Sequence, residues 1–179
     1  KGQKTIKTIT ISYGIEEIGD LAFAGTIKLE SVRIPSSVTS IGNYAFDSCS
    51  SLENVTMPSS VTNIGEYAFA DCSSLKNITI PSGVTSIAQR AFANCRSLTN
   101  ITIPSSVTNI GNFAFINCSN LTNITIPSKV TSMGLKVFDG IPSITVTVPY
   151  KLGENPPSDW DSDWNETGSD CEVKIKYQE

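Results

Sequence analysis

The octamer LTNITIPS occurs at residues 98–105 and again, letter for letter, at residues 121–128. A copy with one change, LKNITIPS, occupies residues 75–82, so the three copies begin at the evenly spaced Leu75, Leu98 and Leu121. Near-identity at a fixed interval is typical of repeat proteins, in which each structural unit must fit the units on both sides. The interval predicts a solenoid with a coil of about 23 residues.

Three residue types keep this period along the chain. A leucine stands six residues after each of the first five phenylalanines, and proline recurs at the same interval until Pro149, which comes one residue early. Stacked coils bury each phenylalanine between its neighbours, which predicts a continuous internal ladder. The phenylalanines are Phe23, Phe46, Phe69, Phe92, Phe115 and Phe138.

The coil at residues 74–96 shows how one unit folds. Polar and apolar residues alternate at 77–80, as in a strand with one buried face. Pro81 ends this strand because proline has no N–H to donate. Residues 84–87 predict a second short strand, and residues 89–92 predict a helical turn that points Phe92 inward.

The resulting pattern, CxSLxxIxIPxxVxxIGxxAFxxC, resembles the BspA-like, or Treponema-type, leucine-rich repeat over about residues 15–149. The resemblance implies an α/β repeat solenoid: a right-handed coil of about six 23-residue repeats. It further implies a parallel β-sheet on the concave face and short helical turns on the other side. Three positions depart from the pattern: Ala88 replaces a glycine, and the cysteine is absent at Thr26 and Ile141.

The two ends of the chain differ from the repeat. We expect an array at residues 1–149 that includes a degenerate N-terminal cap at about residues 1–14. Residues 150–179 predict a C-terminal cap, in which a loop with Trp160 and Trp164 is followed by a last strand. Solenoids need such caps because the end coils otherwise expose their core.

Composition excludes several classes of function. The net charge of −4 and the pI near 4.9 argue against a nucleic-acid binder. No apolar run is long enough to span a membrane, so we expect no membrane insertion of this segment. The chain has no histidine, the commonest general base and zinc ligand, so neither an enzyme nor a cofactor is expected. Its start has no signal-peptide pattern, which suggests a fragment or processed form.

The outward side chains of the strands form the candidate binding site. If the leucine and isoleucines point inward, rows of asparagine and threonine lie on the sheet, which is the usual recognition surface of leucine-rich repeats. An alternative is that these rows only hydrogen-bond along the stack and keep the face soluble. The candidate residues are Arg33, Glu53, Asn54, Thr56, Lys76, Asn77, Thr79, Asn100, Thr102, Asn123 and Thr125.

Two other sets of residues have structural explanations that we favour. Four cysteines follow the repeat, and we expect buried thiols rather than disulfides or metal ligands; Cys171, outside the array, is also expected to be a buried or free thiol. The aromatic residues Tyr44, Tyr67 and Phe113 recur at one position, which indicates either a surface line or partly buried ridge residues. The four cysteines are Cys49, Cys72, Cys95 and Cys118.

Asp159, Asp161 and Asp163 have the alternate spacing of a calcium-binding loop. However, Trp164 stands at the sharp-turn position, where such loops need glycine, and Asp170 stands at the twelfth, where they need glutamate. A solvated acidic loop is the interpretation that we favour, and we expect no metal site.

The leading functional hypothesis is a non-catalytic, monomeric binding module that is secreted or at the cell surface. The resemblance implies adhesion, through a protein or glycan on a host or neighbouring cell. A structural spacer or stalk with no ligand of its own is the alternative, and it fits the near-identity of the coils. Ice binding by threonine rows and enzymatic activity are weaker hypotheses.

Overall fold

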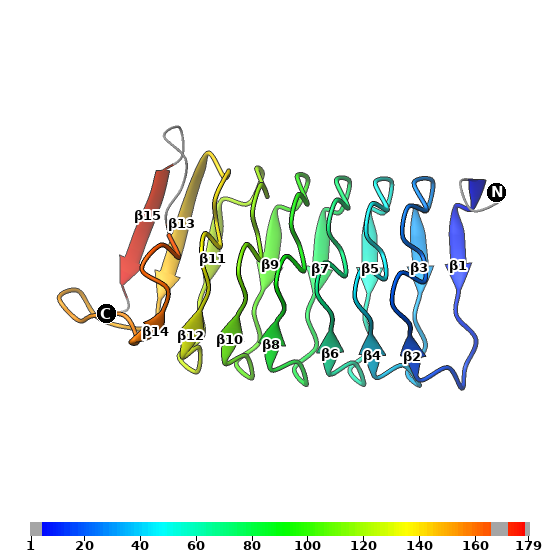
Figure 1. Cartoon of the computed structure of the whole chain (residues 1–179), viewed down its shortest axis with the longest axis horizontal. Coiled ribbons are helices and arrows are strands. Elements are labelled where there is room, and N and C mark those ends of the chain that lie inside the picture. The colour runs from blue at the N-terminus through cyan, green and yellow to red at the C-terminus, as the bar shows by residue number, and fades with distance from the viewer. Residues whose placement is uncertain (1–4, 166–171, 178–179) are drawn as a thin grey trace.

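The computed structural model describes residues 5–165 and 172–177, which form a solenoid of about seven turns (Figure 1). Each turn contributes one strand to a long parallel row. We call the outward side of this row the strand face. Its strands are β1 (Thr8–Thr10), β3 (Ser31–Arg33), β5 (Asn54–Thr56), β7 (Asn77–Thr79), β9 (Asn100–Thr102), β11 (Asn123–Thr125), β13 (Ser143–Val148) and β15 (Glu172–Tyr177).

A second row of two-residue strands lies where each coil returns. Paired strands are parallel and in register at the predicted interval, as in Asn77↔Asn100. Pairing of Asn123 with Thr145 makes the interval one residue shorter, as the early Pro149 indicated. The second row is β2 (Glu17–Ile18), β4 (Ser40–Ile41), β6 (Asn63–Ile64), β8 (Ser86–Ile87), β10 (Asn109–Ile110), β12 (Ser132–Met133) and β14 (Asp159–Trp160).

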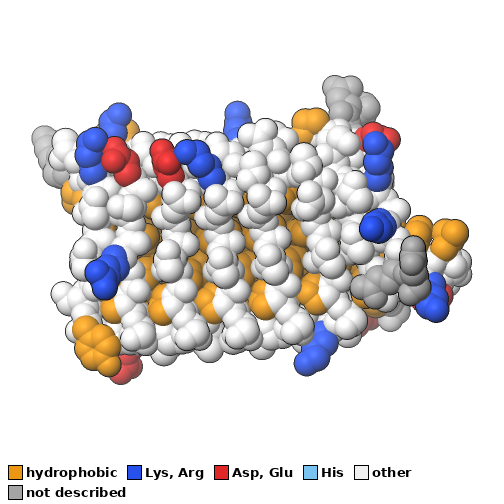
Figure 2. All heavy atoms as spheres, turned by 180° about the vertical axis from the view of Figure 1, so that it is seen from behind, with side chains coloured by type: hydrophobic (Ala, Val, Ile, Leu, Met, Phe, Trp, Pro, Cys, Tyr) orange, Lys and Arg blue, Asp and Glu red, His pale blue; other side chains and the backbone are white. Residues whose placement is uncertain are grey.

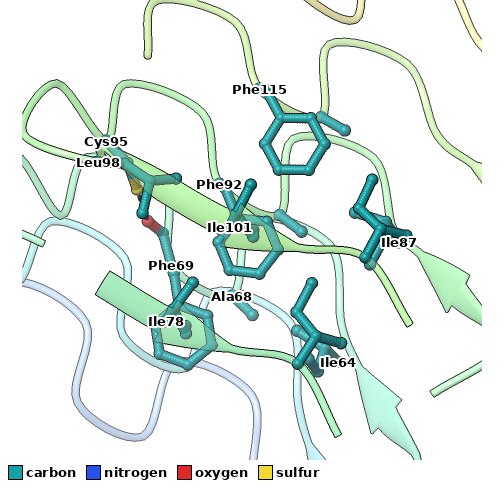
Figure 3. Close-up of a cluster of buried hydrophobic side chains, with 14 of the residues drawn as sticks. Ile64, Ala68, Phe69, Ile78, Ile87, Phe92, Cys95, Leu98, Ile101 and Phe115 are labelled. Carbon is teal, nitrogen blue, oxygen red and sulfur yellow. Dashed lines mark hydrogen bonds between the residues drawn. The ribbon is translucent and has the colours of Figure 1, made fainter. Parts of the chain in front are cut away.

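The predicted phenylalanine ladder runs through the core. Consecutive rings stack at centroid distances of 5.3, 5.2, 5.8, 5.7 and 6.1 Å from Phe23 to Phe138. All except Phe23 are fully buried. Figure 3 shows Phe69, Phe92 and Phe115 one above the other, beside inward aliphatic side chains of β7 and β9. Each buried ring contributes roughly 1.5–3 kcal/mol through removal of apolar surface from water.

The predicted helical turns are wrong. No α-helix occurs among the residues that the structure describes. The segment around Phe46 shows why, because its amides alternate between two kinds of partner. Phe46 N–H donates to the Ala68 carbonyl of the next coil, whereas Asp47 N–H donates to Tyr44, three residues back. An α-helix bonds every amide four residues back within its own segment, so it cannot make these inter-coil bonds.

The backbone conformation of these turns also excludes a helix. Tyr44 and Ser48 have φ of 57° and 59°, in the left-handed region. Both positions recur in the other coils. The first is always occupied by a bulky residue and the second by a small or polar one, including Gly25 and Gly140. Two left-handed residues per turn replace the expected helix with a sequence of tight turns.

At the C-terminal end two tryptophans cover the core. Trp164 packs edge-on against Phe138 at 6.2 Å and against Trp160 at 5.2 Å. The Trp160 indole Nε1–H donates to the Val130 carbonyl at 3.2 Å. At the other end Ile9, on β1, is half-buried and packs against the core. The division into an array and two caps stays a prediction.

The second row is interrupted between β6 and β8, and Ala88 accounts for this break. A Cβ on the equivalent Gly65 or Gly111 would lie 2.7 Å from a backbone nitrogen of the preceding coil. Ala88 carries such a Cβ, so its coil cannot approach as closely. The bond from Thr62 N–H to the preceding coil, 2.9 Å long, therefore has no counterpart at Thr85 among the described residues.

Candidate functional site: the strand face

The strands present their polar residues outward, as the alternation predicted. Asn54, Asn77 and Asn100 are exposed and in register, while Val55 and Ile78 beneath them are buried. Figure 2 shows a face on which uncharged polar groups stand over rows of hydrophobic side chains. The exposed set on β5, β7, β9 and β11 is Asn54, Asn77, Asn100, Asn123, Thr56, Thr79, Thr102 and Thr125.

From β5 to β11 these rows do not hydrogen-bond along the stack, whereas at the same position of β1 and β3 the hydroxyls of Thr8 and Ser31 are hydrogen-bonded at 3.3 Å. Asn100 Nδ2 donates to Thr99 Oγ1 of its own coil at 3.2 Å, and Asn123 does the same to Thr122. No hydrogen bond joins the side chains of successive asparagines from Asn54 to Asn123 among the described residues. Their remaining donors and acceptors face solvent, where a ligand can reach them.

Charged candidates lie at the margin of the face. Lys76 Nζ is 2.9 Å from Glu53 Oε2, and Lys7 makes the same contact with Glu30 at 2.9 Å. The hydrogen bond and charge of Glu30 raise the pKa of Lys7. Exposed pairs of this kind add little stability. Arg33, exposed at the end of β3, is in register with Thr56.

A break in the main sheet divides the strand face between β9 and β11. At the other positions of this 23-residue series the amide donates to the preceding coil, at 2.8, 3.3, 3.0 and 3.2 Å for Glu30, Glu53, Lys76 and Thr99, which precede their strands. The bond is 2.9 Å for Thr145, which lies inside β13. The corresponding bond from Thr122 N–H to the Thr99 carbonyl is absent from this series in the described part of the chain.

A cavity of about 410 Å³ opens at this break. Ile101 and Ile124 contribute its apolar lining, and four of the candidate residues contribute amides and hydroxyls. Sequence reasoning found these side chains but not the break, because the octamers on its two sides are identical. The lining residues are Asn100, Ile101, Thr102, Ile103, Ser105, Asn123, Ile124, Thr125 and Pro127.

The four repeat cysteines are buried free thiols. Each Sγ donates to a phenylalanine carbonyl of the preceding coil at 3.1–3.3 Å, as Cys118 does to Phe92. Burial raises the pKa of Cys49 to about 11 and that of Cys118 to about 12. Such thiols stay protonated at neutral pH and are poor nucleophiles. Cys171 lies outside the described residues.

The aromatic residues Tyr44, Tyr67 and Phe113 belong to a stacked ridge, and Arg90 is a further member that sequence reasoning missed. The Tyr44 and Tyr67 rings stack at 4.5 Å, and the Arg90 guanidinium lies between Tyr67 and Phe113. Tyr44 is 37% exposed and the other members are half-buried. The signal was present, because Arg90 stands one repeat interval from each of these two rings.

The acidic loop shows no gathered ligand set. Asp161 Oδ1 accepts the amide of Asp163 at 2.9 Å, and serine hydroxyls donate to Asp159 and Asp163. No group of three metal-binding side chains occurs among the described residues. Asp170, at the last position of the proposed loop, lies outside them. The calcium hypothesis gains no support from these contacts.

None of the described residues forms a helix of the length and apolarity needed to cross a membrane. No curated protein matches the chain significantly.

Several solved bacterial structures are similar to this chain. A leucine-rich cell surface protein from Faecalibacterium prausnitzii is 37% identical over 80% of this chain and 48% of its own, with a TM-score of 0.62. A leucine-rich repeat protein from Eubacterium ventriosum is 26% identical over 87% and 47%, with a TM-score of 0.62. The chain therefore spans about half the length of these proteins.

The fold is shared more widely. The leucine-rich repeat protein of Treponema pallidum, 23% identical over 96% of this chain and 74% of its own, has a TM-score of 0.53. The model of the BspA type leucine-rich repeat region matches residues 1–95 and 40–156 with six copies. With this match over most of its length, and with coils of the predicted length in register in the structure, the chain belongs to the BspA-type leucine-rich repeat family.

Proposed function

We propose that this chain is a non-catalytic binding module of a secreted or cell-surface protein and recognises a protein or glycan through its strand face. The observation that carries the proposal is the set of exposed asparagine and threonine side chains that leave their groups free between coils. A row that served only to hold the stack together would use those groups in bonds between neighbouring coils.

The similar proteins support a location outside the cell. The relative from Faecalibacterium prausnitzii is a cell surface protein by name, and it is 37% identical to this chain. A role in adhesion to a host or neighbouring cell is consistent with that location. We propose a monomer that acts without a cofactor, because recognition by an exposed polar face needs neither a second subunit nor a cofactor.

A spacer with no ligand of its own is the second candidate. The near-identical octamers favour it, since a stalk needs only a repeated core. The two functions differ in what they predict for the strand face. A spacer tolerates charge there, whereas a binding face loses its ligand.

Binding of the purified chain to immobilised extracellular-matrix proteins and glycans tests the proposal. The test variant changes Thr79, Asn100 and Thr102 to Asp. The control variant adds the same charge beside the second row, at the exposed Thr62, Thr85 and Thr108. Circular dichroism verifies that both variants fold.

We expect binding that the control variant keeps and the test variant loses. Binding that survives in the test variant overturns the strand face as the site. Absence of binding to every partner in the panel favours the spacer.

A further inference from the structure

We propose that the cavity between β9 and β11 is a glycan subsite that holds a neutral sugar unit. The inference rests on the proposed function and names the ligand class and its place on the strand face. It starts from the break between β9 and β11, where side chains of both strands line the cavity.

The opening is local. On the opposite side of the same two coils, Phe113 N–H donates to Leu135 at 2.9 Å and Phe115 N–H to Val137 at 3.0 Å. The strands β10 and β12 also stay paired. The coils are therefore held together on the sides away from the strand face, so the cavity is a fixed feature of the array and not a separation of its two ends.

The groups around the cavity select the chemistry of its occupant. Its lining has no charged side chain, so an anionic or cationic group would lose hydration without gaining an opposite charge. An apolar occupant would remove water from the Thr102 and Thr125 hydroxyls and from the amide oxygens of Asn100 and Asn123 without offering them a partner. A neutral polyhydroxylated ring satisfies both conditions.

A hydroxyl group fits this polar lining. It donates one hydrogen bond and accepts others, so a sugar hydroxyl can pair with the Asn100 and Asn123 amides or with the Thr102 and Thr125 hydroxyls. The buried Ile101 and Ile124 supply an apolar floor for the C–H face of the ring. The volume of about 410 Å³ is within the range of small-ligand pockets.

A peptide strand is a poorer occupant. Insertion between two strands requires them to stand roughly 10 Å apart, twice the spacing of paired strands. The strands β9 and β11 still have Cα atoms within 8 Å of each other. An extended peptide therefore cannot pair with both edges.

The test uses defined probes: the neutral trisaccharides of glucose, xylose and N-acetylglucosamine, with trigalacturonate as a matched anionic probe. Amide chemical-shift changes and saturation-transfer difference NMR report binding. The test variant is Thr102→Val with Thr125→Val, which removes two hydroxyls at nearly constant shape from strand positions that valine suits. The control is Thr56→Val, at the same position of β5 outside the cavity.

We expect at least one neutral trisaccharide to change the chemical shifts of the Asn100, Thr122 and Asn123 amides. Its affinity should be about tenfold lower for the test variant and unchanged for the control. Equal loss in the control, shifts elsewhere on the chain, or preference for trigalacturonate overturns the subsite. Binding of a matrix protein without any saccharide overturns the subsite and leaves the binding module standing. Failure of both ligand classes overturns both proposals.

Discussion

The guanidinium carbon of Arg90 lies 4.7 Å from the ring centroid of Phe113 and 5.5 Å from that of Tyr67. A cation thus occupies the place that a tyrosine ring takes in the two preceding coils. The backbone of Arg90 has φ of 52°, a conformation that costs a non-glycine residue free energy. Contact between neighbouring coils offsets this cost.

The Arg90 contact predicts an order of stability among three proteins. We expect Arg90→Ala to lower the free energy of unfolding by about 1–2 kcal/mol, because it loses both ring contacts and keeps the strained φ. Arg90→Gly should lose less, since glycine adopts positive φ freely. Urea unfolding measures the order. If the Arg90→Ala variant has the same free energy of unfolding as the wild type, the contacts of Arg90 contribute nothing to stability.

Ala88 predicts a stabilising substitution. Ala88→Gly should allow β6 and β8 to pair and raise the free energy of unfolding by about 1 kcal/mol, although glycine has a larger entropy cost on folding. The matched reverse change, Gly111→Ala, should cost about 1–3 kcal/mol. Denaturant unfolding and amide exchange of Thr85 report the effect. A less stable Ala88→Gly variant with an unprotected Thr85 amide would contradict the explanation of the break.

The phenylalanine ladder predicts that position in the stack sets the cost of truncation. Phe92→Ala, in the middle, should cost about 3–5 kcal/mol because it leaves a cavity between two rings. Phe23→Ala should cost less, since Phe23 is only half-buried and stacks on one ring. Thermal and urea unfolding compare the two. Equal losses would mean that the ladder does not depend on neighbours on both sides.

The buried thiols predict a loss of stability at alkaline pH. The folded pKa of Cys118, about 12, lies above the ordinary thiol value of 9.0, so the native state keeps a proton that the unfolded state releases. The stabilisation that this buried thiol gives the folded state is complete below pH 9 and is lost as pH rises to about 12. Urea unfolding at pH 8, 9.5 and 11 should show a shallower decline for Cys118→Ala than for the wild type. If the stability of both proteins falls equally with pH, groups other than Cys118 cause the loss.

The cysteines also predict a simple chemical result. In the native protein at pH 8, iodoacetamide should alkylate the four repeat cysteines slowly, and unfolding in urea should expose all of them. Mass spectrometry of the modified chain measures the difference. Rapid native labelling of Cys72 or Cys95 would contradict their burial.

Much of the fold followed from the spacing of residues. The recurrence of Phe23 to Phe138 predicted the coil length and the core ladder, and the alternation in LKNITI predicted which side of each strand is buried. The helical turns were wrong because a segment such as residues 44–49 has the composition of a short helix. Its amides find better partners in the next coil, and no local pattern records that choice.

The sequence by itself determined the period, the buried set and the polar rows of the strand face, because each depends on one coil and its repetition. The tertiary structure alone decided that the Thr99–Thr122 bond is missing while its equivalents form. The same octamer lies on both sides of the break, so local preferences there are equal. Pairing instead depends on how each coil is held by the whole stack, including the shorter interval between β11 and β13. That collective fit places the cavity.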